Sequence, residues 1–191
     1  MRRIMVLGAC LLIASVVFAH VTPNVQLLNR GDFTKSSLAG AVTFSEIQLQ
    51  IGTSDMAAIK KATRWTPSGE DVKMYAGRDA QAQIVGTAVF VWMPSEHGPV
   101  GIGVAFDRSG RILRADVTDV GTEPLVWVRP LLKSGGMSAF QGLLPDQAPN
   151  HAQIAPDVSG GMNRYYAEVI AQGVIRAQAL ELIALVTEKE K

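Results

Sequence analysis

The sequence predicts an α+β domain in which a twisted antiparallel sheet packs against a long C-terminal helix, with one transmembrane or signal helix ahead of it at the N-terminus. Three observations support this prediction. Segments rich in β-branched and aromatic residues, with turn residues between them, occupy residues 84–93, 100–106 and 111–118. Apolar residues then recur every three or four positions along residues 163–189. An apolar run of membrane-spanning length occupies residues 4–21.

The N-terminal run, residues 4–21, has no charged side chain unless His20 is protonated. As a helix its eighteen residues would span roughly 27 Å, which is close to the hydrocarbon thickness of a bilayer. Two interpretations stay open: a retained single-pass anchor, which we favour, and a signal peptide cut after Ala19. In both, Arg2 and Arg3 stay in the cytoplasm and the remainder of the chain lies outside.

The composition excludes several classes of site. The 18 lysines and arginines nearly balance the 17 aspartates and glutamates, which argues against a general nucleic-acid-binding protein. The single cysteine, Cys10, lies in the apolar run, so the chain has no intrachain disulfide and no thiolate metal site. It resembles a lipoprotein cysteine only superficially, because most of the apolar run follows it. The histidines, His20, His97 and His151, lack the spacing of metal ligands, so no metal site is predicted.

Residues 22–76 are mixed in character and are predicted to be a linker or docking region with one short strand. Polar and turn-forming residues dominate residues 22–45. Ile47, Leu49 and Ile51 alternate with other residues, which is the signal for a short strand. Residues 56–62 are better suited to a helical turn.

The three central segments should form neighbouring strands. The first, residues 84–93, lacks polar alternation and is predicted to be a strand buried on both faces. In the second, Gly101 and Gly103 indicate that another group approaches the backbone closely. Asp107-Arg-Ser-Gly110 is a tight turn with glycine where positive φ is favoured, so the second and third segments should pair as an antiparallel hairpin.

Two stretches between the hairpin and the last helix are predicted to be irregular. Residues 125–132 are strongly apolar around Trp127, but Pro130 limits any regular element there. Residues 144–156 carry three prolines and form a connection.

The C-terminal helix is predicted over residues 163–189, with Asn163 as its N-cap. Gly173 costs about 1 kcal/mol relative to alanine inside a helix, so we expect it to lie where another element packs closely.

A loop of small residues, Asp-Val-Ser-Gly-Gly-Met at positions 157–162, leads directly into this helix. Glycines let the backbone approach a ligand, and the free N–H groups and the positive end of the helix dipole suit a phosphate. The candidate phosphate-binding residues are therefore Ser159, Gly160, Gly161 and the N–H groups as far as Asn163, with Arg164 adding a full charge.

Four segments in one order carry a resemblance to a known family. Residues 98–112 read GPVGIGVAFDRSGRI, Thr122-Glu-Pro124 follows, and A-F-Q-G at 139–142 and D-V-S-G-G-M at 157–162 come next. In that order they resemble the hairpin, Glu-Thr-Pro, xFxGK and D-x-[ST]-G-A-T segments of the FMN-binding domain family. This family includes flavoprotein subunits of the sodium-pumping NADH:quinone reductase and of the Rnf complex. The resemblance covers residues from about 77 to 178, so residues 77–191 are expected to form an FMN-binding-like domain.

The departures from the family pattern concern the site itself. In the covalent members a flavin transferase joins the FMN phosphate to the threonine hydroxyl that ends the motif, and Met162 stands at that position here. A thioether cannot form the phosphoester, so covalent attachment at Met162 is not possible. The order of the Glu-Thr pair is reversed to Thr122-Glu123, and Leu143 replaces the basic residue that follows the third segment.

The resemblance implies a non-covalently held FMN, with cofactor-binding residues Ser159, Gly160, Gly161, Met162, Asn163, Thr122 and Glu123. Trp127, Phe140, Tyr165 and Met162 could line a pocket for the isoalloxazine ring. The opposite interpretation is that the loop is simply a flexible lead into the helix and that Met162, a good filler of irregular apolar gaps, occupies the vacated flavin volume.

The expected function is that of a membrane-anchored subunit of a membrane redox complex that transfers electrons through this flavin. The alternative is a flavin-free structural or interaction subunit of a membrane electron-transport complex that has lost the cofactor. Its partners would be other subunits of that complex and, through the N-terminal helix, the bacterial cytoplasmic membrane, with the domain on the periplasmic side. No nucleic acid is expected as a partner.

No independent catalytic constellation is evident in the sequence. Glu123 and His97 are an acid and a base, but nothing in the sequence places them together. The tryptophans are expected to be core residues, and Arg108, Arg111 and Arg114 to form a solvated face of the hairpin.

Overall fold

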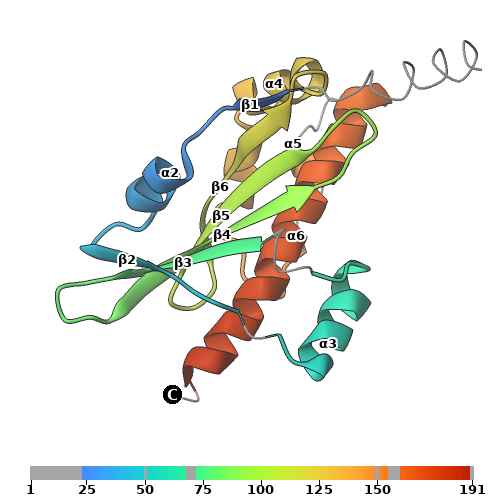
Figure 1. Cartoon of the computed structure of the whole chain (residues 1–191). Helices are drawn as coiled ribbons and strands as arrows, with labels where there is room; N and C mark the ends of the chain where they lie inside the picture. Colours follow the sequence, from blue (N-terminus) through green and yellow to red (C-terminus); the bar gives the residue numbers. More distant parts are fainter. Residues whose placement is uncertain (1–22, 50, 68–71, 149–150, 155–159, 190–191) are drawn as a thin grey trace, which may run out of the picture.

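The computed structural model describes residues 23–189 apart from residues 50, 68–71, 149–150 and 155–159. Six strands form one antiparallel sheet in the order β1-β6-β5-β4-β3-β2. They are β1 (Asn24–Gln26), β2 (Thr43–Glu46), β3 (Val72–Arg78), β4 (Ile84–Met93), β5 (Val100–Asp107) and β6 (Ile112–Gly121). The long helix α6 (Gly161–Lys189) crosses one face of the sheet (Figure 1). The predicted class, an antiparallel sheet with a long C-terminal helix, is confirmed, while residues 4–21 lie outside the described residues.

The three predicted central strands are confirmed as β4, β5 and β6. The β5–β6 hairpin closes through the predicted turn, and Gly110 has φ +78°. Inside the turn, an oxygen of the Asp107 carboxylate accepts the N–H groups of Ser109 and Arg111 at 2.8 and 3.0 Å. Burial acts to raise the pKa of Asp107, but these bonds and the Ser109 hydroxyl stabilise the carboxylate and leave its pKa below the ordinary value.

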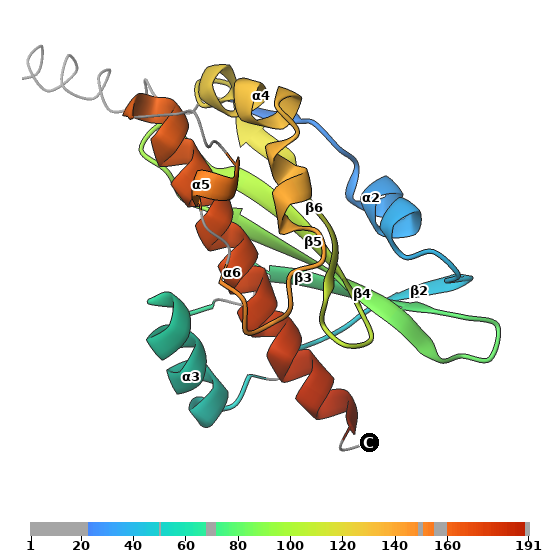
Figure 2. The same ribbon diagram turned by 180° about the vertical axis from the view of Figure 1, so that it is seen from behind.

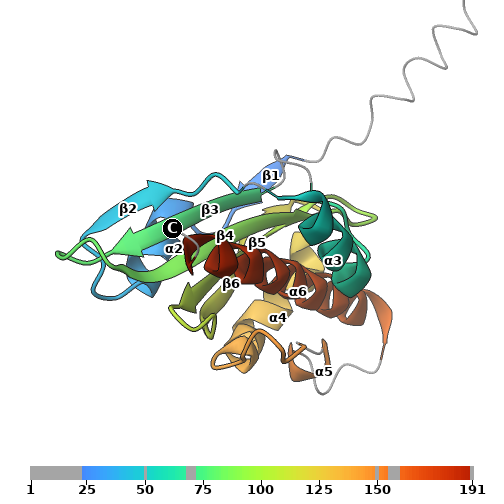
Figure 3. The same ribbon diagram turned by 90° about the horizontal axis from the view of Figure 1, so that it is seen from below.

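The sheet is curled, because register shifts interrupt its ladders. One lies between Gly77 and Arg78 in the β3–β4 pair, and two lie in the β5–β6 pair, between Gly101 and Ile102 and between Ala105 and Phe106. An extra residue on one strand increases the local twist. Figure 3 shows α4, α5 and α6 together on one side of the curled sheet.

Each face of the sheet packs against a helix. Val89, Val91 and their neighbours on one face join α6 in the main core. Helix α2 (Arg30–Ser37) lies on the opposite face (Figures 1 and 2), where Phe33 packs with Ala88 and Phe90 in a smaller cluster. Strand β4 therefore buries both faces, which confirms the prediction made from its lack of polar alternation.

Glycines lie where elements meet most closely. A Cβ on Gly173 of α6 would lie 2.7 Å from Cγ1 of Ile102 and 3.0 Å from Cγ of Met93, which confirms the expected close packing there. On the other face, a Cβ on Gly103 would lie 2.9 Å from the Phe90 ring, because these two residues are cross-strand partners. A side chain at either position would push helix or ring away from the sheet.

Helix α4 (Leu125–Lys133) corrects the expectation that Pro130 limits regular structure. The proline lacks the N–H that would bond to the carbonyl four residues earlier, on Val126. Val126 is 65 % exposed, so that part of the helix faces solvent and water can take the place of the missing donor. Val128 and Leu131, on the opposite side, are buried in the main core, and their burial keeps the helix in place.

Of the remaining short helices, α3 (Thr53–Thr63) and α5 (His151–Ile154) contact α6, and the 3₁₀ helix η1 (Gly136–Phe140) contacts β6, α4 and α5. The predicted helical turn at residues 56–62 is confirmed as part of α3. The connection predicted over residues 144–156 contains α5, a single helical turn.

Residues 22–76 contain β1, α2, β2, α3 and most of β3. The strand predicted from Ile47, Leu49 and Ile51 is wrong in position, because the strand is β2 at Thr43–Glu46. Those three side chains are instead partly buried against the main core. Their alternation marks a segment with one face against the core and not a strand of the sheet.

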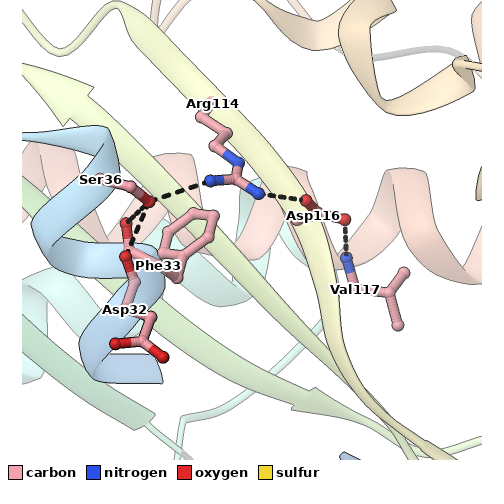
Figure 4. A network of polar contacts seen from close by, with 6 residues as sticks. All are labelled: Asp32, Phe33, Ser36, Arg114, Asp116 and Val117. Carbon is pink, nitrogen blue, oxygen red and sulfur yellow. Dashed lines mark hydrogen bonds and ion pairs between the residues drawn. The ribbon is translucent and has the colours of Figure 1, made fainter. Parts of the chain in front are cut away.

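Polar contacts attach α2 to β6 on the outer face (Figure 4). Arg114 donates to the Ser36 hydroxyl at 3.1 Å and to the Asp116 carboxylate at 2.8 Å. Its guanidinium also lies 5.0 Å from the centre of the Phe33 ring. Arg114 is therefore a link between helix and sheet, in contrast to the solvated role expected for it.

Candidate functional site

Four segments meet at the end of the sheet where α6 begins. They are the β4–β5 loop (residues 94–99), residues 122–124 after β6, the first turn of α4 and the first two turns of α6. Figure 1 shows the starts of α4 and α6 at this same end, and α4 contacts α6 directly. Two of these segments carry the predicted cofactor-binding residues.

A cluster of aromatic rings joins the segments. The rings of Trp127 on α4 and Tyr166 on α6 stack with centroids 5.7 Å apart and an interplanar angle of 8°. His97 lies 5.1 Å from Trp127, and Tyr165 lies edge-on to Tyr166 at 5.1 Å. Because Tyr166 is fully buried and contacts both neighbours, it is the centre of the cluster.

The tyrosine hydroxyls fix the β4–β5 loop onto α6. The Tyr165 hydroxyl accepts the N–H of Glu96 at 3.1 Å, and the Tyr166 hydroxyl lies 3.1 Å from the Ser95 hydroxyl. Ser95 in turn donates to the carbonyl of Gly98. Burial raises the pKa of Tyr166, so this side chain is a neutral phenol that can donate to Ser95.

His97 and Glu123 are in direct contact, although no pattern in the sequence pairs them. Nδ1 of His97 lies 2.7 Å from Oε1 of Glu123. The side chains are 32 % and 41 % exposed, so the pair lies at the edge of the aromatic cluster. The contact ties the β4–β5 loop to the segment before α4, and it occupies one carboxylate oxygen of a predicted cofactor-binding residue.

The start of α6 is an open glycine entrance. Gly161 has φ +73°, a conformation that favours glycine, and both Gly160 and Gly161 are exposed. A Cβ added at either glycine would meet nothing within 4 Å. A phosphate could therefore approach the backbone here without displacing protein atoms. Ser159 lies outside the described residues.

Two of the remaining predicted residues of this entrance, Met162 and Arg164, already contact other parts of the protein. The helix begins at Gly161, so Asn163 lies in the first turn and is not the N-cap, which corrects that prediction. The Met162 side chain is partly buried against the main core. Arg164 is in an ion pair with Glu168 of the same helix at 3.1 Å.

Thr122 makes contacts on the other side of the site. Its hydroxyl and its N–H both donate to the carbonyl of Pro23, at 2.6 and 3.0 Å. It also lines an open cavity of about 400 Å³ along α4, with Leu125, Val126, Arg129, Pro130 and Lys133. That cavity is not lined by Gly160, Gly161, Met162 or Asn163.

The structure thus brings together some of the residues named for a flavin pocket. Trp127 and Tyr165 both belong to the aromatic cluster, whereas Phe140 is fully buried in the main core. Sequence reasoning missed Tyr166 as a site residue, because its helical spacing marks it only as a core residue. The Trp127–Tyr166 stack joins residues far apart in the chain, and no local pattern signals it.

A second polar group is buried further along α6. Glu181 is 1 % exposed, and one of its carboxyl oxygens accepts the Thr87 hydroxyl at 2.6 Å. Its other oxygen has no hydrogen-bond partner among the described residues. Burial raises the pKa of Glu181 to about 8, so this carboxyl is largely protonated at neutral pH.

Metal-ligand clusters and membrane-spanning helices are both absent from the part of the chain that the structure describes. No three His, Cys, Asp or Glu side chains are grouped so that they could hold a metal ion within it. Among the same residues, no helix combines the length and apolar character that crossing a membrane requires.

Comparison with protein-family models, with curated proteins and with solved structures finds no match for this chain.

Proposed function

We propose that this chain is an FMN-binding-like subunit of a bacterial membrane redox complex, which holds its flavin non-covalently and transfers electrons through it. In this proposal residues 4–21 are a retained single-pass anchor and the domain lies on the periplasmic side of the cytoplasmic membrane. Other subunits of the complex donate and accept the electrons.

One observation carries the proposal. The two segments expected to contact the cofactor, Thr122-Glu123 and Gly160–Asn163, are far apart in the chain. Trp127 follows Glu123 by four residues, and Tyr166 follows Met162 by four residues. The stack of these two rings therefore holds both segments at one end of the sheet. A cofactor contacted by both segments needs this arrangement.

The open glycine entrance fits the phosphate of such a cofactor. The exposed backbone of Gly160 and Gly161 leaves room for an anion, and the first N–H groups of a long helix carry partial positive charge. Helix-end electrostatics contribute only about 0.3–1 kcal/mol at an exposed site, so the ring must supply most of the affinity. Within the aromatic cluster beside the entrance, Trp127 and Tyr165 are partly exposed and are the rings that such a flavin could contact.

The chain contributes binding and position, and not chemistry of its own. A bound flavin supplies reversible electron transfer. The glycine entrance would hold its phosphate, and the neutral Tyr166 and the His97–Glu123 pair would fix the β4–β5 loop beside it. Attachment through Met162 is excluded because the thioether has no hydroxyl to form a phosphoester.

A second function, a flavin-free structural subunit of such a complex, is favoured by a different observation. Tyr166 is fully buried under Trp127, and Met162 is packed against the main core. These side chains fill the space beside the glycine entrance with protein atoms. In that case the same end of the domain is a docking surface for partner subunits.

Purification from the native membrane distinguishes the two functions. The chain is extracted in mild detergent, its visible spectrum is recorded, and acid denaturation then separates free flavin from the chain. We expect flavin absorbance and complete release of FMN. A colourless, well-folded preparation that copurifies with other membrane subunits would support the flavin-free function instead, and flavin that stays on the denatured chain would contradict non-covalent binding.

A further inference from the structure

The outer face of α4 carries positive charge next to apolar side chains. Val126, Arg129, Pro130 and Lys133 are all exposed and follow the spacing of one helical face. Helix α4 contains no acidic residue, and neither cation has an ion-pair partner among the residues that the structure describes. The open cavity of about 400 Å³ lies along this face and is lined by the same four residues with Thr122 and Leu125.

This face is tied to the point where the chain enters the domain. The carbonyl of Pro23 accepts two hydrogen bonds from Thr122, which stands three residues before α4 begins. The next residue, Asn24, pairs with Gly121 as β1 joins β6. Figure 1 shows β1 and α4 at the same end of the molecule.

The apolar run proposed as the membrane anchor ends at Val21, two residues before Pro23. Two extended residues reach at most about 7 Å. The α4 face is therefore fixed close to the membrane surface if the run stays in the bilayer. Cations beside exposed apolar side chains are the pattern of helices that lie in the interfacial region.

We propose that this face of α4 (Val126, Arg129, Pro130 and Lys133) rests on the membrane surface and binds the phosphate groups of anionic phospholipids. Arg129 and Lys133 would contact lipid phosphates, and Val126 and Pro130 would enter the headgroup region. The proposal rests on the membrane anchor in the proposed function, but not on the flavin. The contact would hold the domain in a fixed orientation on the bilayer, with the aromatic cluster beside the membrane.

A polarity-sensitive fluorophore at Val126 tests this contact. The full-length chain with Cys10→Ser and Val126→Cys is labelled and reconstituted into vesicles of phosphatidylcholine, alone or mixed with phosphatidylglycerol. We expect a blue shift of the emission in the mixed vesicles that is lost at high salt, because screening weakens the attraction. Adding Arg129→Gln and Lys133→Gln should abolish the shift. The matched control is Lys60→Gln with Lys61→Gln on the exposed side of α3. It removes the same amount of charge and should leave the blue shift unchanged.

The outcomes separate the contact from its premises. A chain that stays in the vesicles through alkaline carbonate extraction, with the same solvent-like emission in both lipids, would overturn the lipid contact alone. Loss of the chain from the vesicles would overturn the anchor, and the α4 proposal with it. The shift is expected in preparations with and without flavin, so the absence of flavin contradicts the electron-transfer function and leaves this proposal standing.

Discussion

Tyr166 of α6 stacks on Trp127 of α4, with ring centroids 5.7 Å apart and planes 8° from parallel. The stack is one of the contacts that hold the first turns of the long helix against α4. It helps to fix the arrangement of the candidate site, because Trp127 and Tyr166 belong to separate helices.

The energy of this stack can be measured with a double-mutant cycle of Trp127→Leu and Tyr166→Leu. Each single variant should be destabilised by about 2–4 kcal/mol, because each loses a large ring that is fully buried at Tyr166 and partly buried at Trp127. The coupling energy should be about 0.5–1.5 kcal/mol, the usual value for an aromatic pair beyond its buried area. Urea unfolding of the four proteins gives these values, and additive single effects would show that the rings do not stabilise each other.

The buried carboxyl of Glu181 should make stability depend on pH. Its pKa is raised from 4.5 to about 8 by burial, so between these values the unfolded chain releases a proton that the folded chain keeps. The stability is therefore fully present below pH 4.5 and falls as pH rises towards 8, by about 3 kcal/mol at pH 7.

Glu181→Gln should remove this dependence, because an amide does not titrate. Thermal unfolding of both proteins from pH 5 to pH 8 would measure it. Glu168→Gln, the same change at a half-exposed position of α6, is the control and should keep the wild-type slope. Equal slopes in wild type and Glu181→Gln would contradict a carboxyl that folds in its protonated form.

The sequence predicts the central sheet and the long helix because their signals are local. Each signal depends on neighbouring residues only. The signals are the β-branched run of β4, the turn at residues 107–110 and the spacing of apolar residues along α6. Helix α4 is not predicted, because Pro130 disfavours a helix and the local sequence favours one only weakly. Burial of Val128 and Leu131 in the main core stabilises the helix nonetheless.

The candidate site is less predictable because its contacts join distant segments. The His97–Glu123 contact and the Thr122–Pro23 bonds link residues with no shared pattern in the sequence. The glycine entrance was found because its residues are adjacent in the chain. Tyr166 was not, because a buried ring at helical spacing has the same local signal whether or not it supports a site.

Gly173 should tolerate no larger side chain. In Gly173→Val, the new Cβ would overlap Ile102 and Met93, so helix and sheet must separate. The expected destabilisation is about 1–3 kcal/mol, despite the entropy advantage of losing a glycine. Chemical denaturation measures it, with Gln172→Val at the exposed neighbouring position as control. Equal stability of Gly173→Val and wild type would mean that α6 does not lie as close to β5 as the structure places it.

Arg114 should stabilise the docking of α2. Arg114→Ala removes the bond to Ser36, the pair with Asp116 and the contact with the Phe33 ring, and should cost about 1–2 kcal/mol. Hydrogen exchange should show faster opening of the α2 amides with little change in α6. Arg108→Ala, at a hairpin arginine that is 59 % exposed, should leave α2 exchange unchanged. Equal α2 protection in Arg114→Ala and wild type would contradict the link.

The most direct test of the proposed function is a fluorescence titration of the flavin-free, full-length chain in detergent with FMN. We predict saturable binding at one site per chain, weakened at least about tenfold by Gly160→Val, whose side chain would fill the open glycine entrance without meeting protein atoms. Ala58→Val, on the exposed side of α3, should bind FMN as wild type does. Absence of saturable binding, or equal affinity in wild type and Gly160→Val, would contradict a phosphate held at the start of α6.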